Sequence, residues 1–374
     1  PRIRVADPVY NAQVICEQAK EAAEHGAKIV VFPELCITGY TCNDLFLQEL
    51  LLEKAKEALL TIAEETGQLE TLFLVGLPVD KDGRLYNVAA VLYRGRILGM
   101  IPKKNIPMYA EFYEGRHFTP GEETVTEYRL GKQVIPFGSN LLFRCEELPE
   151  LILGCELCED LWVAEPPSTS HALMGATVIA NLSASNETVS KDDYRTLLIK
   201  ASSARLLCGY IYTSAGEGES TQDLVFGGHD LIAENGTLLV QSARFTTGIL
   251  YTDLDVLKIS SERRRMGTFG KRPMKPYLTV PFSMQLTGTK LDRKFAAAHP
   301  FVPEDMVERN RRCEDILSIQ AFGLKKRYEH IGCKTAVLGI SGGLDSTLAL
   351  LVTVRTFDLL GLPRSGIIAV TMPC

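Results

Sequence analysis

The spacing of apolar residues over positions 1–256 predicts helices that alternate with strands. In residues 11–25, Val14, Ile15 and Ala19 fall on one helical face, and Gly26 follows where the helix is expected to end. The same helical spacing recurs at 45–65 and 192–207, and strands are expected at 28–32, 72–76, 87–93, 97–101, 151–155, 177–181, 210–214 and 229–233. Such a mixture of helices, parallel strands and tight strand pairs is typical of an α/β fold.

The pattern changes after residue 256. Residues 257–300 contain several prolines and little periodicity, so they are expected to be a connector. Further on, the sequence predicts a helix at 304–329, a strand at 335–340, a helix at 347–360 and a strand at 366–371. This βαβ order is typical of a doubly wound parallel sheet. The expected organisation is a first domain over 1–256, the connector, and the incomplete start of a second α/β domain over 301–374.

Composition narrows the class of protein. The 374 residues carry 40 Lys and Arg against 46 Asp and Glu, and this net charge of -6 argues against nucleic acid as a partner, since no basic excess is present to neutralise phosphates. No uncharged apolar run reaches the ~18 residues that a membrane span requires. The ten cysteines are scattered, which favours free thiols in a reducing, cytoplasmic compartment. Because the chain starts at Pro1 and stops at Cys374 just after an apolar run, it is expected to be a fragment.

The most specific short motif lies between the expected strand at 335–340 and the helix that follows it. The motif consists of Ser341, Gly342, Gly343, Leu344, Asp345, Ser346 and Thr347. Paired glycines let the main chain approach an anion closely, the start of a helix presents unpaired N–H groups, and hydroxyl groups add further donors. The lysine of a Walker A loop is missing. A glycine-rich turn with a capping serine is the alternative, but such a turn would not require the Asp-Ser-Thr that follows the glycines.

Three segments of the first domain carry candidate catalytic residues. Glu34 lies in Val-Phe-Pro-Glu-Leu-Cys, Lys103 in Pro-Lys-Lys-Asn, and Cys158 in Cys-Glu-Asp-Leu-Trp. A thiol, a carboxylate and an ammonium group in one pocket can hydrolyse an amide. The thiolate attacks the carbonyl carbon, the carboxylate takes and returns the proton, and the ammonium group lowers the thiol pKa and stabilises the oxyanion.

Each candidate also has a structural interpretation. Glu34 could cap a helix or lie on the surface, and Lys103 has a neighbouring lysine, which is typical of a solvated pair. Cys155 and Cys158 could form a redox pair or half of a zinc site, but no second cysteine pair exists to complete tetrahedral zinc. None of the six histidines lies in a motif that would support Cys-His catalysis. Cys155 is therefore expected to be a buried strand thiol.

The three segments resemble those of the nitrilase superfamily, and the resemblance covers most of residues 3–256. It implies an αββα sandwich with a Glu-Lys-Cys triad at strand ends. By this resemblance Glu34 is the general base, Lys103 stabilises the oxyanion, and Cys158 is the nucleophile. Glu111 resembles the second glutamate, which positions the lysine and the substrate.

Further residues are candidates for the substrate pocket. Trp162, the only tryptophan, either belongs to the core or forms a wall of the pocket four residues after the nucleophile. Tyr109, Glu114 and Ser185 resemble glutamine-binding positions in the glutamine-dependent branch of the superfamily. Among these, Glu114 and Ser185 are suited to an amino-acid head group.

The loop at 341–347 resembles the pyrophosphate loop of the N-type ATP pyrophosphatases. These enzymes cleave ATP between its α and β phosphates and activate a carbonyl as an acyl-adenylate. The residues that the resemblance implies as the pyrophosphate cradle are Ser341, Gly343, Ser346 and Thr347. Asp345 resembles a ligand of the Mg²⁺ that bridges the phosphates.

A nitrilase-type amidase joined to such a loop resembles the glutamine-dependent NAD⁺ synthetases. The resemblance implies that the first site hydrolyses L-glutamine. The ammonia then attacks nicotinic acid adenine dinucleotide that ATP has adenylated, which gives NAD⁺, AMP and pyrophosphate. It also implies no prosthetic group and a homo-oligomer that channels ammonia, with surfaces such as residues 263–265 as contacts.

Three alternatives stay open on the sequence. A free-standing amidase or carbamoylase would have no use for residues 341–347, and another ATP pyrophosphatase would normally carry a different amidotransferase domain. A scaffold protein with an inactive nitrilase fold would not need intact Glu34, Lys103 and Cys158.

Overall fold

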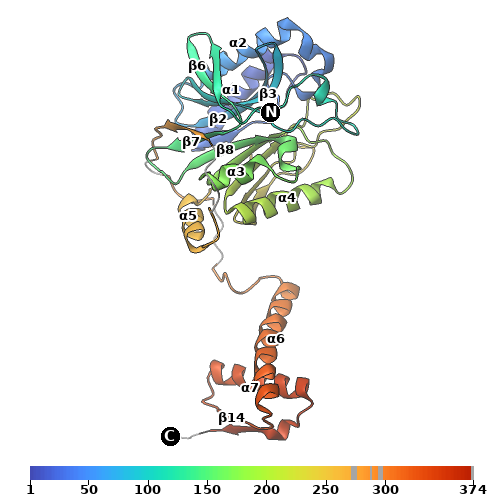
Figure 1. Ribbon diagram of the computed structural model, residues 1–374, viewed down its shortest axis with the longest axis vertical. Coiled ribbons are helices and arrows are strands. Elements are labelled where there is room, and N and C mark those ends of the chain that lie inside the picture. Colours follow the sequence, from blue (N-terminus) through green and yellow to red (C-terminus); the bar gives the residue numbers. More distant parts are fainter. Residues whose placement is uncertain (271–275, 287–288, 294–297, 372–374) are drawn as a thin grey trace. The chain divides into compact units, whose positions relative to one another are not determined.

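The computed structural model describes residues 1–270, 276–286, 289–293 and 298–371. The chain forms two compact units, Pro1–Phe295 and Ala296–Cys374 (Figure 1). The expected connector, residues 257–300, falls largely within the first unit, and three of its segments, 271–275, 287–288 and 294–297, lie outside the described residues.

The first unit contains two β-sheets. The six-stranded sheet has the order β1-β2-β3-β4-β6-β5, with β1 (Ile29–Val31), β2 (Leu72–Lys81), β3 (Arg84–Tyr93), β4 (Arg96–Pro102), β5 (Thr126–Leu130) and β6 (Gln133–Phe137). The seven-stranded sheet has the order β12-β11-β10-β9-β8-β7-β13, with β7 (Leu141–Cys145), β8 (Ile152–Leu157), β9 (Val178–Ser183), β10 (Gly209–Ser214), β11 (Leu231–Glu234), β12 (Thr237–Gln241) and β13 (Leu278–Phe282). Both sheets combine parallel and antiparallel pairs, as the sequence predicts.

Helices cover the outer faces of the two sheets (Figure 1). They are α1 (Pro8–Glu24) and α2 (Glu49–Glu65) on the six-stranded sheet, and α3 (Pro167–Leu173) and α4 (Lys191–Leu206) on the seven-stranded sheet. The inner faces of the sheets pack on each other: Leu74 and Val91 of one sheet share a buried cluster with Leu153 and Val178 of the other. The layers therefore follow the order α-β-β-α, and the expected fold class is confirmed.

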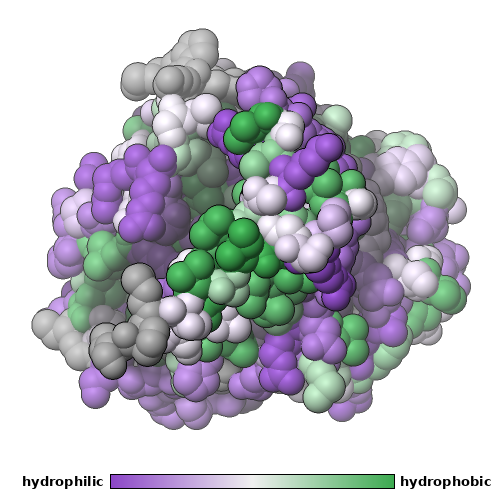
Figure 2. Space-filling view, turned by 90° about the horizontal axis from the view of Figure 1, so that it is seen from below, coloured by the Kyte–Doolittle hydropathy of each residue, from purple (hydrophilic) through white to green (hydrophobic). Residues whose placement is uncertain are grey.

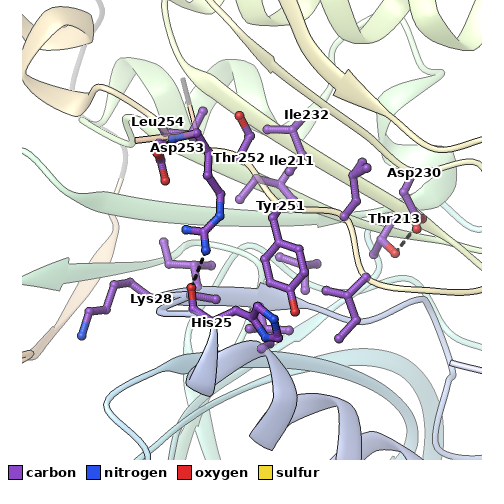
Figure 3. A pocket seen from close by; sticks show the side chains of 18 of the residues that line it. His25, Lys28, Ile211, Thr213, Asp230, Ile232, Tyr251, Thr252, Asp253 and Leu254 are labelled. Atoms are coloured by element: carbon purple, nitrogen blue, oxygen red, sulfur yellow. Dashed lines mark hydrogen bonds between the residues drawn. The ribbon is translucent and has the colours of Figure 1, made fainter. Parts of the chain in front are cut away.

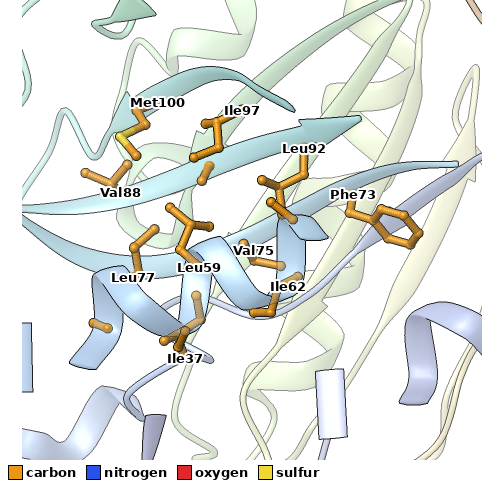
Figure 4. Packing of buried hydrophobic residues seen from close by; sticks show 14 of the residues in the cluster. Ile37, Leu59, Ile62, Phe73, Val75, Leu77, Val88, Leu92, Ile97 and Met100 are labelled. Atoms are coloured by element: carbon orange, nitrogen blue, oxygen red, sulfur yellow. The ribbon is translucent and has the colours of Figure 1, made fainter. Parts of the chain in front are cut away.

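The outer core shows why this sequence forms these layers. Leu59 and Ile62 occupy one face of α2 and pack against Val75, Leu92 and other apolar residues of the sheet (Figure 4). Complete burial of one such side chain contributes roughly 1.5–3 kcal/mol. The apolar residues of α2 thus lie on the helix face that contacts the sheet, and the strands are apolar on the face that α2 covers as well as on the inner face.

The helix expected at 45–65 is divided in the structure. A 3₁₀ segment, η1 (Tyr40–Leu47), is followed by Gln48 in an extended conformation, and α2 begins at Glu49. Gln48 lies within the expected range, and its ψ of 121° is one that a continuous helix does not allow. Local periodicity continues across this break, so it does not reveal the kink.

Residues 257–300 were expected to be a connector, but part of this segment forms regular secondary structure. It includes α5 (Val256–Arg265) and β13, which pairs in parallel with β7 at the edge of the seven-stranded sheet. The sequence did not predict β13 because Pro281 argues against a strand. An edge strand tolerates proline, since one side of its main chain needs no hydrogen-bond partner.

Arg263 in α5 has an intramolecular role. Its guanidinium group donates to the main-chain oxygens of Ala176 (2.6 Å), Leu206 (3.0 Å) and Leu207 (2.9 Å). The carbonyl groups of Leu206 and Leu207 lie at the end of α4, where a helix leaves such groups unpaired, so Arg263 satisfies them. Residues 263–265 were expected to form a contact surface between domains or subunits. Arg263 instead makes these hydrogen bonds within the first unit.

The second unit has the expected βαβ order. Its elements are α6 (Met306–Ile331), β14 (Ala336–Gly339), α7 (Leu344–Leu360), η4 (Arg364–Gly366) and β15 (Ile367–Val370). The strands β14 and β15 are parallel, and Tyr328 of α6 packs on Phe357 of α7 with ring centroids 5.5 Å apart. Among the helices in the described part of the chain, none combines the length and the apolar character of a membrane span.

Large apolar side chains of the second unit are exposed. They include Val337, Leu344, Leu351, Leu359, Ile368 and Val370. The space-filling view in Figure 2 shows apolar residues gathered in a patch on the face that is turned toward the viewer. Contiguous apolar surface is typical of surfaces that contact other protein surfaces.

Candidate active site

Glu34 lies in the loop that follows β1 and is fully buried. This loop crosses β2 at Gly76, where a Cβ atom would lie only 2.3 Å from the Leu35 nitrogen. The Glu34 N–H donates to the main-chain oxygen of Ser183 (3.3 Å) at the end of β9 in the other sheet. The carboxylate is thus fixed at a point where the two sheets meet.

Lys103 follows β4 directly, and its side chain is fully buried. Its Nζ donates to Glu34 Oε1 (2.8 Å) and to both carboxylate oxygens of Glu114, Oε1 at 2.6 Å and Oε2 at 2.8 Å. Burial alone would lower the lysine pKa, but the Glu114 and Glu34 carboxylates outweigh it and raise the pKa well above its usual value. Lys103 is therefore an ammonium group inside the sandwich.

The contact with Lys103 that the resemblance assigns to Glu111 is made by Glu114. Glu114 begins η2 (Glu114–Arg116) and is buried, whereas Glu111 Oε1 accepts a hydrogen bond from Asn186 Nδ2 at 2.8 Å. The assignment of lysine positioning to Glu111 is wrong for this reason. Both glutamates lie in an irregular segment, so their distance along the chain from Lys103 does not reveal which one turns inward.

Cys158 occupies a strained turn at the end of β8, where η3 (Cys158–Leu161) begins. Its φ is 39°, a region that residues with a side chain seldom adopt. The buried Asp160 holds this turn, since its carboxylate accepts from the Leu157 N–H (3.0 Å) and from the Asn105 N–H (2.8 Å). Asp160 thus connects the cysteine turn to the segment that follows Lys103.

The Cys158 thiol is neutral near pH 7. Burial, together with the negative charge of Glu34, raises its pKa to about 12, although the positive charge of Lys103 lowers it. Glu34 Oε2 is buried and has no hydrogen-bond partner in the part of the chain that the structure describes. This oxygen is therefore free to accept a proton, in a site where the thiol needs a base to become a nucleophile.

Cys155 is a buried thiol within β8, as expected. Cys155 and Cys158 are both free, so they do not form a disulfide. Burial raises the pKa of Cys155 well above its usual value, and the charges of Glu156 and Asp160 raise it further. A neutral thiol inside a strand fits packing, which agrees with the interpretation from the sequence.

A ring of polar and aromatic side chains lies around Lys191, at the start of α4. Its ammonium group is 5.4 Å from the ring centre of Trp162 and 5.6 Å from that of Phe112, and it donates to Asn186 Oδ1. Burial lowers the pKa of Lys191, while the charge of a Cys158 thiolate would raise it. No motif marks this lysine in the sequence.

The remaining candidates are placed as follows. The Tyr109 hydroxyl donates to Glu159 Oε1 at 2.9 Å, and Tyr109 is exposed. Ser185 is buried: its N–H donates to Ser214 Oγ at 3.1 Å, and its own Oγ accepts from Arg195 at 3.3 Å. Trp162 is half-buried and contacts Tyr194, with ring centroids 5.6 Å apart.

The loop at 341–347 is open and exposed. Gly342 has a φ of 82°, which favours glycine, and no atom lies within 4 Å of the position that a Cβ would take. The hydroxyl groups of Ser346 and Thr347 both donate to the main-chain oxygen of Gly343, at 3.0 and 2.9 Å. The loop leads from β14 into α7, as expected of an anion-binding turn.

Asp345 lies exposed in the first turn of α7. Within the described residues no group of three or more His, Cys, Asp and Glu side chains could hold a metal ion. A single carboxylate nevertheless fits Mg²⁺, because this ion commonly takes one or two carboxylates and completes its shell with water and nucleotide phosphates.

A cavity of about 960 Å³ lies apart from these residues. It is bordered by β1 and by segments that include Ile211, Asp230, Ile232 and Tyr251 (Figure 3). Glu34, Lys103 and Cys158 are not among its lining residues. The chemistry of the buried ion cluster, rather than cavity size, therefore defines the candidate site.

Residues 1–264 match the carbon-nitrogen hydrolase family, and the chain belongs to this family. Its similarity to curated proteins is more specific. It is 39% identical over 378 residues to the glutamine-dependent NAD(+) synthetase of Mycobacterium tuberculosis (strain ATCC 25618 / H37Rv), which covers 99% of this chain and 56% of that protein. It is 28% identical over 375 residues to the enzyme of the same name from Aquifex aeolicus (strain VF5), which covers 99% of this chain and 59% of that protein. The chain thus spans little more than half the length of these relatives.

Solved structures support the fold. A glutamine-dependent NAD(+) synthetase from Cytophaga hutchinsonii has a TM-score of 0.61 at 23% identity over 96% of this chain and 50% of that chain. The NitN amidase from Neterenkonia sp. AN1 has a TM-score of 0.55 at 21% identity over 71% of this chain and 94% of that chain.

Proposed function

We propose that the first unit hydrolyses the side-chain amide of L-glutamine through Cys158, Glu34 and Lys103. The observation that carries this proposal is the buried Lys103 ammonium group, which contacts Glu34 (2.8 Å) and Glu114 (2.6 Å) beside a neutral cysteine thiol. Burial of a cation between two carboxylates costs desolvation free energy, and apolar residues of similar volume would often stabilise the fold as well. The buried charges therefore favour a catalytic role over a purely structural one. Perturbed groups of this kind cluster at catalytic sites.

Acylation would use the proton-accepting oxygen of Glu34. Glu34 Oε2 takes the proton of the Cys158 thiol as the sulfur attacks the amide carbon. The oxygen of the tetrahedral intermediate becomes negative, and the Lys103 ammonium group stabilises it. The C–N bond then breaks, protonated Glu34 gives its proton to the leaving nitrogen, and ammonia and a glutamyl thioester result.

Deacylation would repeat the sequence with water. Glu34 takes a proton from water, the hydroxide oxygen attacks the thioester carbon, and the C–S bond breaks. The proton returns to the sulfur, so glutamate leaves and the thiol is restored. Glu114 keeps Lys103 in place throughout, because it binds the ammonium group with both oxygens.

The polar ring around Lys191 suits an amino-acid substrate. The Lys191 ammonium group matches an α-carboxylate, and the nearby carboxylates of Glu111 and Glu159 match an α-ammonium group. Trp162 would form a wall of the pocket, and Tyr109 and Ser185 would contact the glutamine, as the resemblance implies for these two residues.

The substrate proposal predicts a selective defect in Lys191→Ala. We expect the wild type to release ammonia from L-glutamine, and the variant to show a KM for glutamine raised by on the order of 10-fold, since one charged contact is worth about 1.5–3 kcal/mol. Hydrolysis of propionamide, which has no α-carboxylate, should change by less than about 2-fold, because it makes no such contact. Equal losses on both substrates would contradict the assignment of Lys191 to the head group.

For the second unit we propose the nucleotide site of a glutamine-dependent NAD⁺ synthetase. Support comes from the open glycine loop at the start of α7 and from the similarity to relatives of that name. The loop would bind the phosphates of ATP, and Asp345 would hold Mg²⁺, which neutralises phosphate charge when bound. Ammonia from the first site would then amidate the adenylated carboxylate of nicotinic acid adenine dinucleotide. A homo-oligomer that channels the ammonia and a cytoplasmic location stay predictions.

A further inference from the structure

Glu219 connects two loops that are far apart in the sequence. It is buried, and its Oε1 accepts the main-chain N–H of Tyr40 at 2.7 Å. Its Oε2 accepts the main-chain N–H of Thr41 at 2.9 Å and the Thr41 hydroxyl at 2.6 Å. A carboxylate that accepts three hydrogen bonds fixes the position of the donors, because each is directional and charge-assisted.

The same connection continues through the neighbouring residues. The Ser220 N–H donates to Thr41 Oγ1 at 2.8 Å, so Thr41 is held from both sides. Gly39, which precedes the pair, has a φ of 88°, and a Cβ there would meet Ile3 Cδ1 at 3.2 Å and the Val5 Cα at 3.3 Å. The conformation of residues 39–41 is therefore restricted in two ways, by the close contacts of Gly39 and by the hydrogen bonds of Tyr40 and Thr41.

Tyr40 extends from this fixed loop to the ion cluster. Its hydroxyl group donates to Glu114 Oε1 at 2.9 Å, and its ring packs edge-on against Phe226, with centroids 5.7 Å apart. Glu114 in turn binds Lys103, and Lys103 binds Glu34. Hydrogen bonds on both ends of Tyr40, at its main-chain N–H and at its hydroxyl group, thus connect Glu219 to Glu114, and further hydrogen bonds lead through Lys103 to Glu34.

Space is available for the ring to shift if the loop is released. A cavity of about 50 Å³ is bordered by Tyr40, Glu114 and Ser220. That volume exceeds the roughly 10–15 Å³ of accessible space that one water molecule needs. Packing alone therefore does not hold the Tyr40 hydroxyl group against Glu114, and the hydrogen bonds of the loop are needed as well.

We propose that Glu219 is a positioning residue for amide hydrolysis: it holds residues 40–41 so that Tyr40 keeps Glu114, and through it Lys103 and Glu34, in the reactive geometry. This inference rests on the proposed function of the first unit. A displacement of about 1 Å in a reacting group can cost on the order of 100-fold in rate, so a residue outside the site can control it.

The test compares Glu219→Gln, Tyr40→Phe and the double variant with the wild type. A glutamine offers only one accepting oxygen, and a phenylalanine removes the donor to Glu114. We expect each single variant to lose on the order of 10- to 100-fold in kcat for glutamine, with KM changed by less than about 3-fold, since the substrate is still bound but the reacting groups are misplaced. The double variant should lose no more than Tyr40→Phe, because both changes break one series of contacts.

The pH profile provides a second readout. Glu114 is faced by Lys103 at the end of β4, Glu34 after β1, Tyr40 at the start of η1 and Asn87 of β3. Loss of the Tyr40 hydrogen bond removes support for the Glu114 carboxylate and raises its pKa. The acid limb of kcat/KM should therefore move to higher pH, by the same amount in both single variants.

Glu234→Gln is the matched control. Glu234 is also buried and accepts a main-chain N–H, that of Asp255 at 2.7 Å, but it lies in β11 and is remote from the ion cluster in sequence and contacts. We expect this variant to keep the wild-type pH profile even if its melting temperature falls. An unshifted acid limb in Glu219→Gln, or additive losses in the double variant, would overturn the proposal.

A readout that does not require turnover separates this inference from the proposed function. If the wild type released no ammonia, the proposed function would be refuted, but the positioning role of Glu219 would still be open to test. Labelling of Cys158 by iodoacetamide, followed by mass spectrometry, then decides about Glu219. Slower labelling by the same factor in Glu219→Gln and Tyr40→Phe supports the positioning role, and labelling at the wild-type rate in both refutes it.

Discussion

Lys103 keeps its charge inside the sandwich because two carboxylates face it, Glu34 and Glu114. Sequence motifs were sufficient to identify Glu34, Lys103 and Cys158 as one candidate site, and the structure pairs Lys103 with Glu34 at 2.8 Å, in a site where both charges act on the pKa of the Cys158 thiol. They were not sufficient to choose between Glu111 and Glu114, since that choice depends on which carboxylate turns inward in an irregular segment. Lys191 was missed for a related reason, because a single lysine at a helix start carries no local signal.

Glu156, next to the site in β8, predicts how stability depends on pH. Burial raises its pKa from 4.5 to about 7, although Tyr210 and Ser168 hydrogen-bond to the carboxylate. A raised pKa in the folded state means that the stability is fully present below pH 4.5 and is lost as pH rises toward 7. The loss amounts to up to about 3 kcal/mol, at 1.36 kcal/mol per pKa unit.

Urea unfolding at pH 5 and pH 8, followed by the fluorescence of Trp162, measures this effect. The wild type should lose more free energy of unfolding between these pH values than Glu156→Gln, which carries no titrating proton at this position. The same pH dependence in both proteins would show that Glu156 does not titrate in this range.

At the scale of elements, strands and turns place the chemistry. The sequence predicted most strands of the two sheets from apolar runs, because buried strands carry a strong local pattern. It did not predict β13, since prolines weaken that pattern and its pairing with β7 depends on a partner more than 130 residues away. The break before α2 was also hidden, because both of its sides are apolar at helical spacing.

The crossing of the Glu34 loop over β2 gives a prediction at this scale. In Gly76→Ala the added Cβ would lie 2.3 Å from the Leu35 nitrogen, so the loop must shift and carry Glu34 away from Lys103. We expect a destabilisation of about 1–3 kcal/mol and a fall in kcat on the order of 100-fold. Chemical unfolding and the ammonia assay measure the two effects.

Gly323→Ala is the control for this variant. Gly323 lies within α6, and no atom lies within 4 Å of the position that a Cβ would take there, so alanine should stabilise the helix by about 0.5–1 kcal/mol. Normal activity in Gly76→Ala would contradict the role of this crossing.

At the scale of the whole molecule, two compact units with different candidate sites share one chain. The order of motifs along the sequence predicts a first domain, a connector and the start of a second domain, since each motif lies in its own pattern of strands and helices. The chain spans little more than half the length of its curated relatives, and the proposed coupling of the two sites concerns a protein of their length.

Two variants in a protein of that length should separate the two sites. Cys158→Ala is expected to abolish NAD⁺ formation with glutamine and to preserve it with added ammonia, because only the source of nitrogen is lost. Asp345→Asn should reduce both reactions together, since it weakens the nucleotide site that they share. Chromatographic measurement of NAD⁺ and AMP distinguishes these patterns, and ammonia-dependent activity that survives in Asp345→Asn at the wild-type level would exclude the metal role.

The most direct test of the central claim is ammonia release from L-glutamine by the wild type, Cys158→Ala and Cys155→Ala. Both cysteines are buried and free, and they lie three residues apart at the end of β8, so they differ mainly in access to Glu34 and Lys103. The assignment of Cys158 as the nucleophile predicts ammonia release by the wild type and by Cys155→Ala, and a loss of at least about 1,000-fold in Cys158→Ala, as expected when a nucleophile is removed. Undiminished release by Cys158→Ala would contradict it.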